Sequence, residues 1–282
     1  MNSPWRRIAQ RLRRDRAALL ALAYLVLLAA AALLAPVLAP YPPLAVDFDA
    51  VRQPPSPQHW LGTDQQGRDI LSRLLYGARI SLAVGVVSQV PVLLIGLAAG
   101  CAAGYYGGRS DAVIMRTVDV FYAFPSLLFL ITVMAILGRG FGPLLLALTL
   151  TAWAGLARLV RGQVLQLRQA EFVAAARCVG ASDRRILARH LLPNLSGVLL
   201  VFLSLAIPGA IVAEAGLSFL GLGLLPPAPS WGIMLSDGFA VLRSAPHIAL
   251  FPGLAIALTM LALFVLGDSL RDASDPRMAA GL

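Results

Sequence analysis

The sequence predicts an all-α integral membrane protein, and three observations support this fold class. Of its 282 residues, 59% are hydrophobic and only 13% are charged, with a mean hydropathy of +0.78. A soluble globular domain has roughly 45–50% apolar and about 25% charged residues, so this composition argues against a soluble domain. The second observation is a set of long uncharged apolar runs. The third is the concentration of arginine in the gaps between these runs.

Six apolar runs reach the length of about 18 residues that a membrane-spanning helix needs. We place them near residues 17–39, 82–104, 118–138, 140–159, 194–214 and 247–267. Only the GRGFGP turn around Arg139 separates the third run from the fourth, which predicts a tight helical hairpin. The sequence therefore predicts six transmembrane helices.

Two other segments could change this number of spans. The uncharged stretch 215–236 could be a seventh span, but Pro226, Pro227 and Pro229 interrupt it and each removes a backbone donor. We expect a re-entrant or surface element there instead. The basic leader before the first run leaves a cleaved signal peptide as an alternative. The first apolar run is longer than the roughly 7–15 residues of a signal h-region, which favours an uncleaved span.

Arginine supplies all of the positive side-chain charge, since the chain has no lysine, and the formal net charge is +9. The arginines concentrate in the N-terminal tail and in the long segment 160–193. Cytoplasmic loops of membrane proteins carry the excess of basic residues, so we expect both termini and this segment in the cytoplasm. The same placement argues against a nucleic-acid partner, which would need a basic surface outside the membrane.

The cytoplasmic segment contains the stretch EFVAAARCVGASDRRILARHLLPN, residues 171–194, which predicts two short helices joined by a tight turn. Glu171 lies in the first turn of an alanine-rich helix, where a carboxylate favours the positive end of the helix dipole. Gly180 is placed to end that helix in a left-handed conformation. Ser182 is the expected N-cap of the second helix, with Asp183 in its first turn.

One face of the first helix carries a small apolar patch with arginines around it. The patch consists of Phe172, Ala175, Ala176 and Val179, and the arginines are Arg177, Arg184, Arg185 and Arg189. A solvated loop that only sets topology is the alternative, but such a loop needs no pair of capped helices. A small apolar face with charge around it is the form of a docking element.

The pattern E-x-x-A-A-x-x-x-G, followed by an isoleucine and then Leu-Pro, resembles the EAA motif of bacterial ABC-importer permeases. The matching positions are Glu171, Ala174, Ala175 or Ala176, Gly180, Ile186, Leu192 and Pro193. In that family the segment is the coupling helix, which sits in a groove of the ATPase subunit and passes on its motion. The resemblance implies ATPase docking through Glu171, Phe172, Ala174, Ala175, Ala176, Arg177, Gly180, Ala181, Ser182 and Arg185.

Three further stretches resemble permeases of the dipeptide, oligopeptide and nickel type, specifically the C-type subunit. They are HWLGTDQQGRDILSRLLYGARISL (59–82), EAGLSFLGLGLLPPAPSWGIMLSDG (214–238) and LGDSLRDASDPR (266–277). The resemblance implies the architecture of a type I ABC-importer permease. Residues 1–81 would form the basic tail, first transmembrane helix and periplasmic segment, and residues 82–282 a five-helix permease core.

The resemblance also implies a function: import of di- or oligopeptides from a periplasmic binding protein by alternating access, in the bacterial inner membrane. The implied partners are a second homologous permease, one or two ABC ATPase subunits, the binding protein and membrane lipid. A permease for nickel or metal chelates, from the same family, is the alternative. A secondary transporter is a more distant one, because such proteins usually carry ionisable residues within the membrane and only Glu214 comes close.

The chain has no catalytic constellation. It lacks a GxxxxGK[ST] pattern, and without lysine it cannot supply the P-loop residue that contacts nucleotide phosphates. We therefore expect no catalytic residue, no metal site and no cofactor bound by this chain. ATP and Mg are expected on separate ATPase subunits.

Two groups of polar residues remain open to more than one interpretation. Asp64, Arg68, Asp69 and Arg73 alternate in sign, and Asp69 and Arg73 have i,i+4 spacing. They form either exposed ion pairs worth only tenths of a kcal/mol each, or a periplasmic surface that contacts the binding protein or shapes the entry. Glu214 is the one carboxylate at the edge of an apolar run, where it lines the pathway, lies at a subunit interface or has a structural role.

Overall fold

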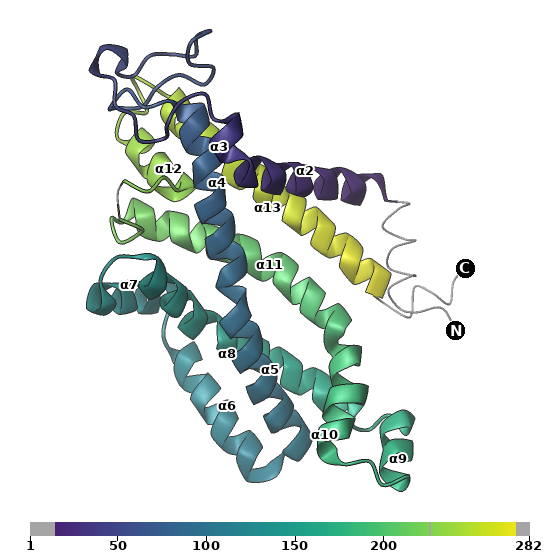
Figure 1. The fold of residues 1–282 in the computed structure, drawn as a ribbon. Helices are drawn as coiled ribbons and strands as arrows, with labels where there is room; N and C mark the ends of the chain where they lie inside the picture. Colours follow the sequence, from purple (N-terminus) through teal and green to yellow (C-terminus); the bar gives the residue numbers. More distant parts are fainter. Residues whose placement is uncertain (1–14, 226, 275–282) are drawn as a thin grey trace.

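The computed structural model describes residues 15–225 and 227–274, which form helices and no β-sheet (Figure 1). The helices in chain order are α2 (Arg16–Leu33), α3 (Ala35–Leu38), η1 (Phe48–Ala50), α4 (Ile70–Val87), α5 (Gln89–Tyr106), α6 (Gly108–Ala123), α7 (Ser126–Leu137), α8 (Phe141–Leu167), α9 (Glu171–Cys178), α10 (Asp183–Ile186), η2 (Leu187–Leu191), α11 (Leu192–Phe219), α12 (Trp231–Phe239) and α13 (His247–Ser274). The predicted all-α class is confirmed.

Five continuous helical segments are long and apolar enough to cross a membrane: α2, α4 with α5, α8, α10 through α11, and α13. Helices α6 and α7 add a sixth crossing if they count as one span, but they meet at an angle of 88°. The span predicted near 118–138 is therefore a bent pair of helices in the structure. Phe124 precedes Pro125 and is extended, as residues before proline usually are, so the helix ends there.

The second span begins earlier than predicted, because α4 starts at Ile70 inside the segment expected to be periplasmic. The Asp69 carboxylate caps it by accepting the Ser72 N–H at 2.8 Å. Helix α5 follows after Ser88, close to Pro91, which has no N–H to donate. The boundary that we placed between residues 81 and 82 falls inside α4.

The stretch after the fifth span contains no spanning helix among its described residues, as predicted. Helix α11 ends at Phe219, and the nine-residue α12 follows only at Trp231. Pro226, the basic N-terminal tail and the end of the 266–277 stretch lie outside the described residues.

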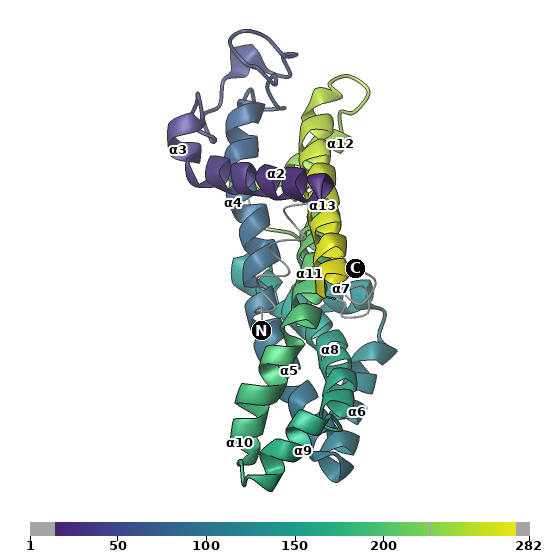
Figure 2. The ribbon, with the colours of Figure 1, turned by 90° about the vertical axis from the view of Figure 1, so that its right-hand side faces the viewer.

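The two ends of the molecule carry different structures, and both views show this (Figures 1 and 2). The loop between α3 and α4 lies with α12 at one end, and α9 and α10 lie at the opposite end. Helix α2 packs along α13 and against α4. Asp15 caps α2 and accepts a hydrogen bond from the Ser269 hydroxyl of α13.

Helices α5 and α8 form the most extensive helix pair, and a line of glycines makes their close contact possible. Gly96, Gly100 and Gly104 are four residues apart on the face of α5 that meets α8. A Cβ atom at Gly100 would lie 2.6 Å from the Ala157 carbonyl oxygen. Small residues at this spacing allow two backbones to approach closely within a membrane.

Candidate functional site

Helix α9 ends as its sequence predicts. Gly180 has a φ of +76°, which glycine adopts without the steric penalty that a Cβ imposes. The Gly180 N–H donates to the Arg177 carbonyl at 2.9 Å, and the Ala181 N–H donates to the Ala176 carbonyl at 3.0 Å. These two bonds make a Schellman motif, which satisfies carbonyls that the helix end leaves without donors. The turn between α9 and α10 is therefore defined by its backbone.

The inner face of α9 fastens it to the transmembrane helices. Val173 and Ala176 are buried in an apolar cluster with Tyr105 of α5, Val164 of α8 and Leu195 of α11. This differs from the predicted patch, which placed Ala176 on the outer face. A period of 3.6 residues puts Val173 and Ala176 on the same side of the helix.

The outer face of α9 is largely exposed in the described part of the chain, where Phe172 contacts the His190 ring at a centroid distance of 6.4 Å. Phe172 is 40% exposed and Val179 is 84% exposed, and Ala175 lies exposed between them. The other predicted docking residues that are exposed are Glu171, Ala174, Arg177, Gly180, Ser182 and Arg185, whereas Ala181 is half-buried. Ser182 occupies the N-cap position of α10, but its side chain makes no capping hydrogen bond, contrary to the prediction.

A polar contact joins the turn after α9 to the second span. The Tyr105 hydroxyl at the end of α5 donates to Asp183 Oδ1 at 2.6 Å. The Arg177 guanidinium lies over the same tyrosine ring, with its Cζ 5.6 Å from the ring centroid. Both α9 and α10 thus contact one side chain of α5, a link that the sequence did not predict because the residues are far apart in the chain.

Arg161 of α8 and Arg168 at its C-cap connect the helices at the same end of the molecule. Arg168 donates through Nη1 to the Gly104 carbonyl at 3.1 Å and so caps the end of α5. Arg161 forms a bidentate ion pair with Asp111 of α6, in which Nε donates to Oδ1 at 2.5 Å and Nη2 donates to Oδ2 at 2.6 Å. The helices next to α9 are therefore connected by polar bonds as well as by apolar packing.

The four charged residues at the start of α4 and just before it do not form the exposed surface that we considered. Asp64, Asp69 and Arg73 are buried, and Arg68 is half-buried. Asp64 Oδ2 accepts from Arg68 Nε at 2.7 Å and lies 3.4 Å from Arg73 Nε. The expected pairing of Asp69 with Arg73 is wrong, because Asp69 bonds His59 Nδ1 at 3.0 Å and caps α4.

These buried contacts attach the segment to α12 and α13. Gln65 Nε2 donates to the Asp237 carbonyl of α12 at 2.5 Å, and Arg68 Nη2 lies 4.0 Å from the carboxylate of the same residue. Burial raises the pKa of Asp237, and the nearby Arg73 and Arg68 oppose this shift. His247 Nε2 at the start of α13 lies 3.3 Å from the Thr63 carbonyl oxygen. The segment that contains Asp64, Arg68, Asp69 and Arg73 therefore stabilises the packing of α4, α12 and α13.

Glu214 also serves an internal contact. It is fully buried in α11, and its Oε1 accepts hydrogen bonds from Ser218 and Ser230, both at 2.8 Å. Ser230 in turn caps α12 by accepting the Ile233 N–H. The carboxylate thus fixes the start of α12 against α11, which favours the structural role among the roles considered for it.

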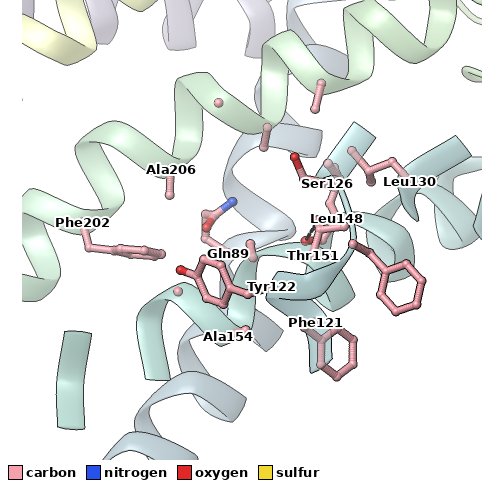
Figure 3. A pocket seen from close by; sticks show the side chains of 16 residues that line it. Gln89, Phe121, Tyr122, Ser126, Leu130, Leu148, Thr151, Ala154, Phe202 and Ala206 are labelled. Atoms are coloured by element: carbon pink, nitrogen blue, oxygen red, sulfur yellow. Dashed lines mark hydrogen bonds between the residues drawn. The ribbon is translucent and has the colours of Figure 1, made fainter. Parts of the chain in front are cut away.

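A cavity of about 530 Å³ lies beside the bend between α6 and α7 (Figure 3). Its walls come from α5, the α6–α7 bend, α8 and α11. The lining residues are Gln89, Phe121, Tyr122, Phe124, Ser126, Leu130, Leu148, Thr151, Ala152, Ala154, Gly155, Phe202, Ala206, Gly209, Ala210 and Ala213. The sequence reasoning missed this site, although Gln89 was an available signal as a polar residue inside a predicted span.

Comparison with known proteins identifies two family matches. Residues 94–280 match the family described as "Binding-protein-dependent transport system inner membrane component". Residues 3–55 match the family described as "N-terminal TM domain of oligopeptide transport permease C". Together these matches cover the N-terminal span, helices α6 to α13 with α9 among them, and every cavity-lining residue except Gln89.

Similar full-length proteins and a solved structure agree with these matches. The dipeptide transport system permease protein DppC of Bacillus subtilis (strain 168) is 45% identical over 95% of this chain and 84% of its own length. The glutathione transport system permease protein GsiD of Escherichia coli O6:K15:H31 (strain 536 / UPEC) is 46% identical over 99% of this chain and 92% of its own. A chain of the inward-facing MetNI methionine ABC transporter has the same fold, with a TM-score of 0.59 at 18% identity, covering 73% of this chain and 98% of that one.

Proposed function

Because the chain belongs to the family of binding-protein-dependent transport system inner membrane components, we propose that it is the non-catalytic permease subunit of an ATP-driven peptide importer. It works with a second homologous permease, with one or two ATPase subunits that hold ATP and Mg, and with a periplasmic binding protein. The complex lies in the bacterial inner membrane, with the α9 end of this chain in the cytoplasm.

The construction of α9 is the observation that carries this proposal. Its inner face is packed against three transmembrane helices, and its outer face presents Phe172, Ala175 and Val179 as exposed apolar residues. A short helix that is fixed on one side and apolar on the other can transmit a push, because its displacement must move the cluster beneath it. A partner that closes on ATP would supply this push, and the Tyr105–Asp183 bond would direct it to α5.

Peptides are the cargo that we propose, ahead of nickel or metal chelates. The relatives described above are named for dipeptide and glutathione transport, and an oligopeptide permease OppC of Bacillus subtilis (strain 168) is 43% identical over 98% of this chain. The cavity of about 530 Å³ lies within the range of roughly 300–1,000 Å³ that small-molecule sites occupy. Alternating access would open this region to each side of the membrane in turn.

Substitution of Ala175 tests the docking role of α9. Tryptophan at this exposed position would hold an ATPase surface away from the helix, while the inner face of α9 stays packed. We expect Ala175→Trp to insert normally and to lose substrate-stimulated ATP hydrolysis in proteoliposomes. Ala17→Trp, at an exposed alanine of α2, is the matched control and should retain that hydrolysis.

Two results would contradict the proposal. One is normal stimulated hydrolysis in the Ala175→Trp complex. The other is the reproducible absence of an ATPase subunit when the native complex is purified. Uptake of a labelled dipeptide into vesicles that hold the complete complex, dependent on ATP and on the loaded binding protein, tests the cargo directly.

A further inference from the structure

Gln89 carries a buried hydrogen-bond acceptor with no partner among the described residues. The residue is 4% exposed, and its Oε1 has no donor within bonding distance. Its Nε2 donates to Ser88 Oγ at 3.0 Å, so the amide is held from one side only. Buried polar side-chain atoms usually have a partner, and an exception calls for an explanation such as a ligand that is not always present.

The unpartnered oxygen belongs to the wall of the cavity beside the α6–α7 bend. Figure 3 shows the Gln89 amide projecting among Tyr122, Ala154 and Ala206, each of which also lines this cavity. Gln89 lies at the buried end of the lining, whereas Tyr122 and Gly209 are exposed. A molecule that enters past the exposed residues would therefore meet the Gln89 oxygen deep in the cavity.

The rest of the lining indicates the class of molecule. None of the sixteen lining residues is charged, and most of the wall is aromatic or small and apolar. Hydroxyls come from Tyr122, Ser126 and Thr151. Such a wall does not select for side-chain charge, and a single acceptor suits a donor that differing peptides share, the main-chain N–H. A contact of this kind is weak enough for cargo to leave again.

We propose that Gln89 is a cargo-contact residue whose Oε1 accepts a hydrogen bond from a main-chain N–H of the peptide in transit. This inference rests on the proposed function and names a residue for it. A competing explanation is that the oxygen bonds the second permease, as polar side chains often do between membrane helices. Its depth favours cargo, since an interface would be met first by the exposed residues around the cavity.

The experiment compares Gln89→Met with wild type in proteoliposomes that hold both permeases, the ATPase subunits and binding protein. Methionine has a similar length and removes the acceptor, and Ser88 Oγ still donates to the Gly85 carbonyl. The binding protein is loaded beforehand with either a dipeptide or the same dipeptide methylated at its peptide nitrogen. Thr149→Val is the control, because Thr149 is buried in α8 outside the cavity and its hydroxyl already bonds Leu145.

We expect wild type to transport the unmethylated dipeptide with a roughly fivefold higher kcat/KM, the size of one neutral hydrogen bond. Gln89→Met should lower the kcat/KM for uptake of that dipeptide by the same factor, so that the unmethylated and methylated dipeptides have equal kcat/KM. Thr149→Val should keep the wild-type preference for the unmethylated dipeptide. A wild-type preference in Gln89→Met overturns the inference. Loss of the second permease from the purified Gln89→Met complex also overturns it, by assigning the oxygen to the interface. Absence of uptake by wild type overturns the proposed function, and this inference with it.

Discussion

Replacement of Gly180 by alanine isolates the contribution of the left-handed turn after α9. No heavy atom lies within 4 Å of the position that a Cβ would take, so the new methyl group meets no neighbour. The cost is then confined to the backbone, where a φ of +76° costs a non-glycine residue roughly 1–2 kcal/mol. In the unbound Gly180→Ala permease, the loop relieves this strain by leaving the left-handed conformation. Binding of the ATPase subunit must restore that conformation, so the strain lowers the affinity. We expect affinity for the ATPase subunit to fall by a factor of roughly 5–30.

The assay is a titration of the purified permease pair with the ATPase subunit, followed by a measurement of substrate-stimulated hydrolysis. Gly180→Asn should lie between wild type and Gly180→Ala, because asparagine visits the left-handed region more readily than alanine. Gly162→Ala is the matched control, since Gly162 lies in α8 with open space around it and no positive φ. Binding by Gly180→Ala that equals the control would refute the reasoning. Equal losses for Ala and Asn would contradict the backbone explanation.

Three other substitutions test separate parts of the structure. Gly100→Leu should lower the Tm of the purified protein, because its Cβ would overlap the backbone of α8 and overpacking costs roughly 1–3 kcal/mol; an unchanged Tm would argue against the close α5–α8 contact. Hydrogen bonds from the Ser269 hydroxyl, and then from backbone amides of α2, lower the pKa of Asp15 below its ordinary value. The ionised carboxylate therefore stabilises the fold above the pKa of the unfolded chain, and this stabilisation is lost as the pH falls through the lower pKa of the folded protein. We expect Asp15→Asn to reduce thermal stability equally at about pH 5 and about pH 8, and a loss confined to one of these would contradict the assignment. Gln53→Cys in a Cys178→Ser background should react with an impermeant thiol reagent only from the periplasm. In the unsubstituted protein the exposed Cys178 should react only from the cytoplasm. The reverse pattern would overturn the topology.

Features that depend on neighbouring residues could be predicted from the sequence. Gly180 follows an alanine-rich helix and lies two residues before the polar Ser182, and this local pattern is enough to place the left-handed turn. The apolar runs likewise predict the spans, because a membrane demands length and hydrophobicity in one continuous stretch. The bend at Pro125 was missed although its signal is local, because hydropathy does not distinguish a straight span from a broken one.

Features that depend on distant partners could not be predicted. Asp69 lies four residues before Arg73, which suggested an ion pair, but the fold brings His59 to it instead. Tyr105 and Asp183 are far apart in sequence and meet only because α5 and α10 pack at the same end. The inward direction of Ala176 is similar, because a helix with apolar residues on several sides does not reveal which side its neighbours cover.

The interlocked backbones of α5 and α8 restrict how a push from α9 can travel. A slide of one helix past the other would drive larger residues into the glycine positions, so the two helices move together as a single lever. Two features adjoin this lever: Ser88, where α4 passes into α5 with helical backbone angles, and the bend before Pro125, where α6 and α7 meet at 88°. Gln89 follows Ser88, Phe124 and Ser126 flank Pro125, and all three residues line the cavity. A tilt begun at the docking helix would therefore be converted into a change in the width of the cavity itself.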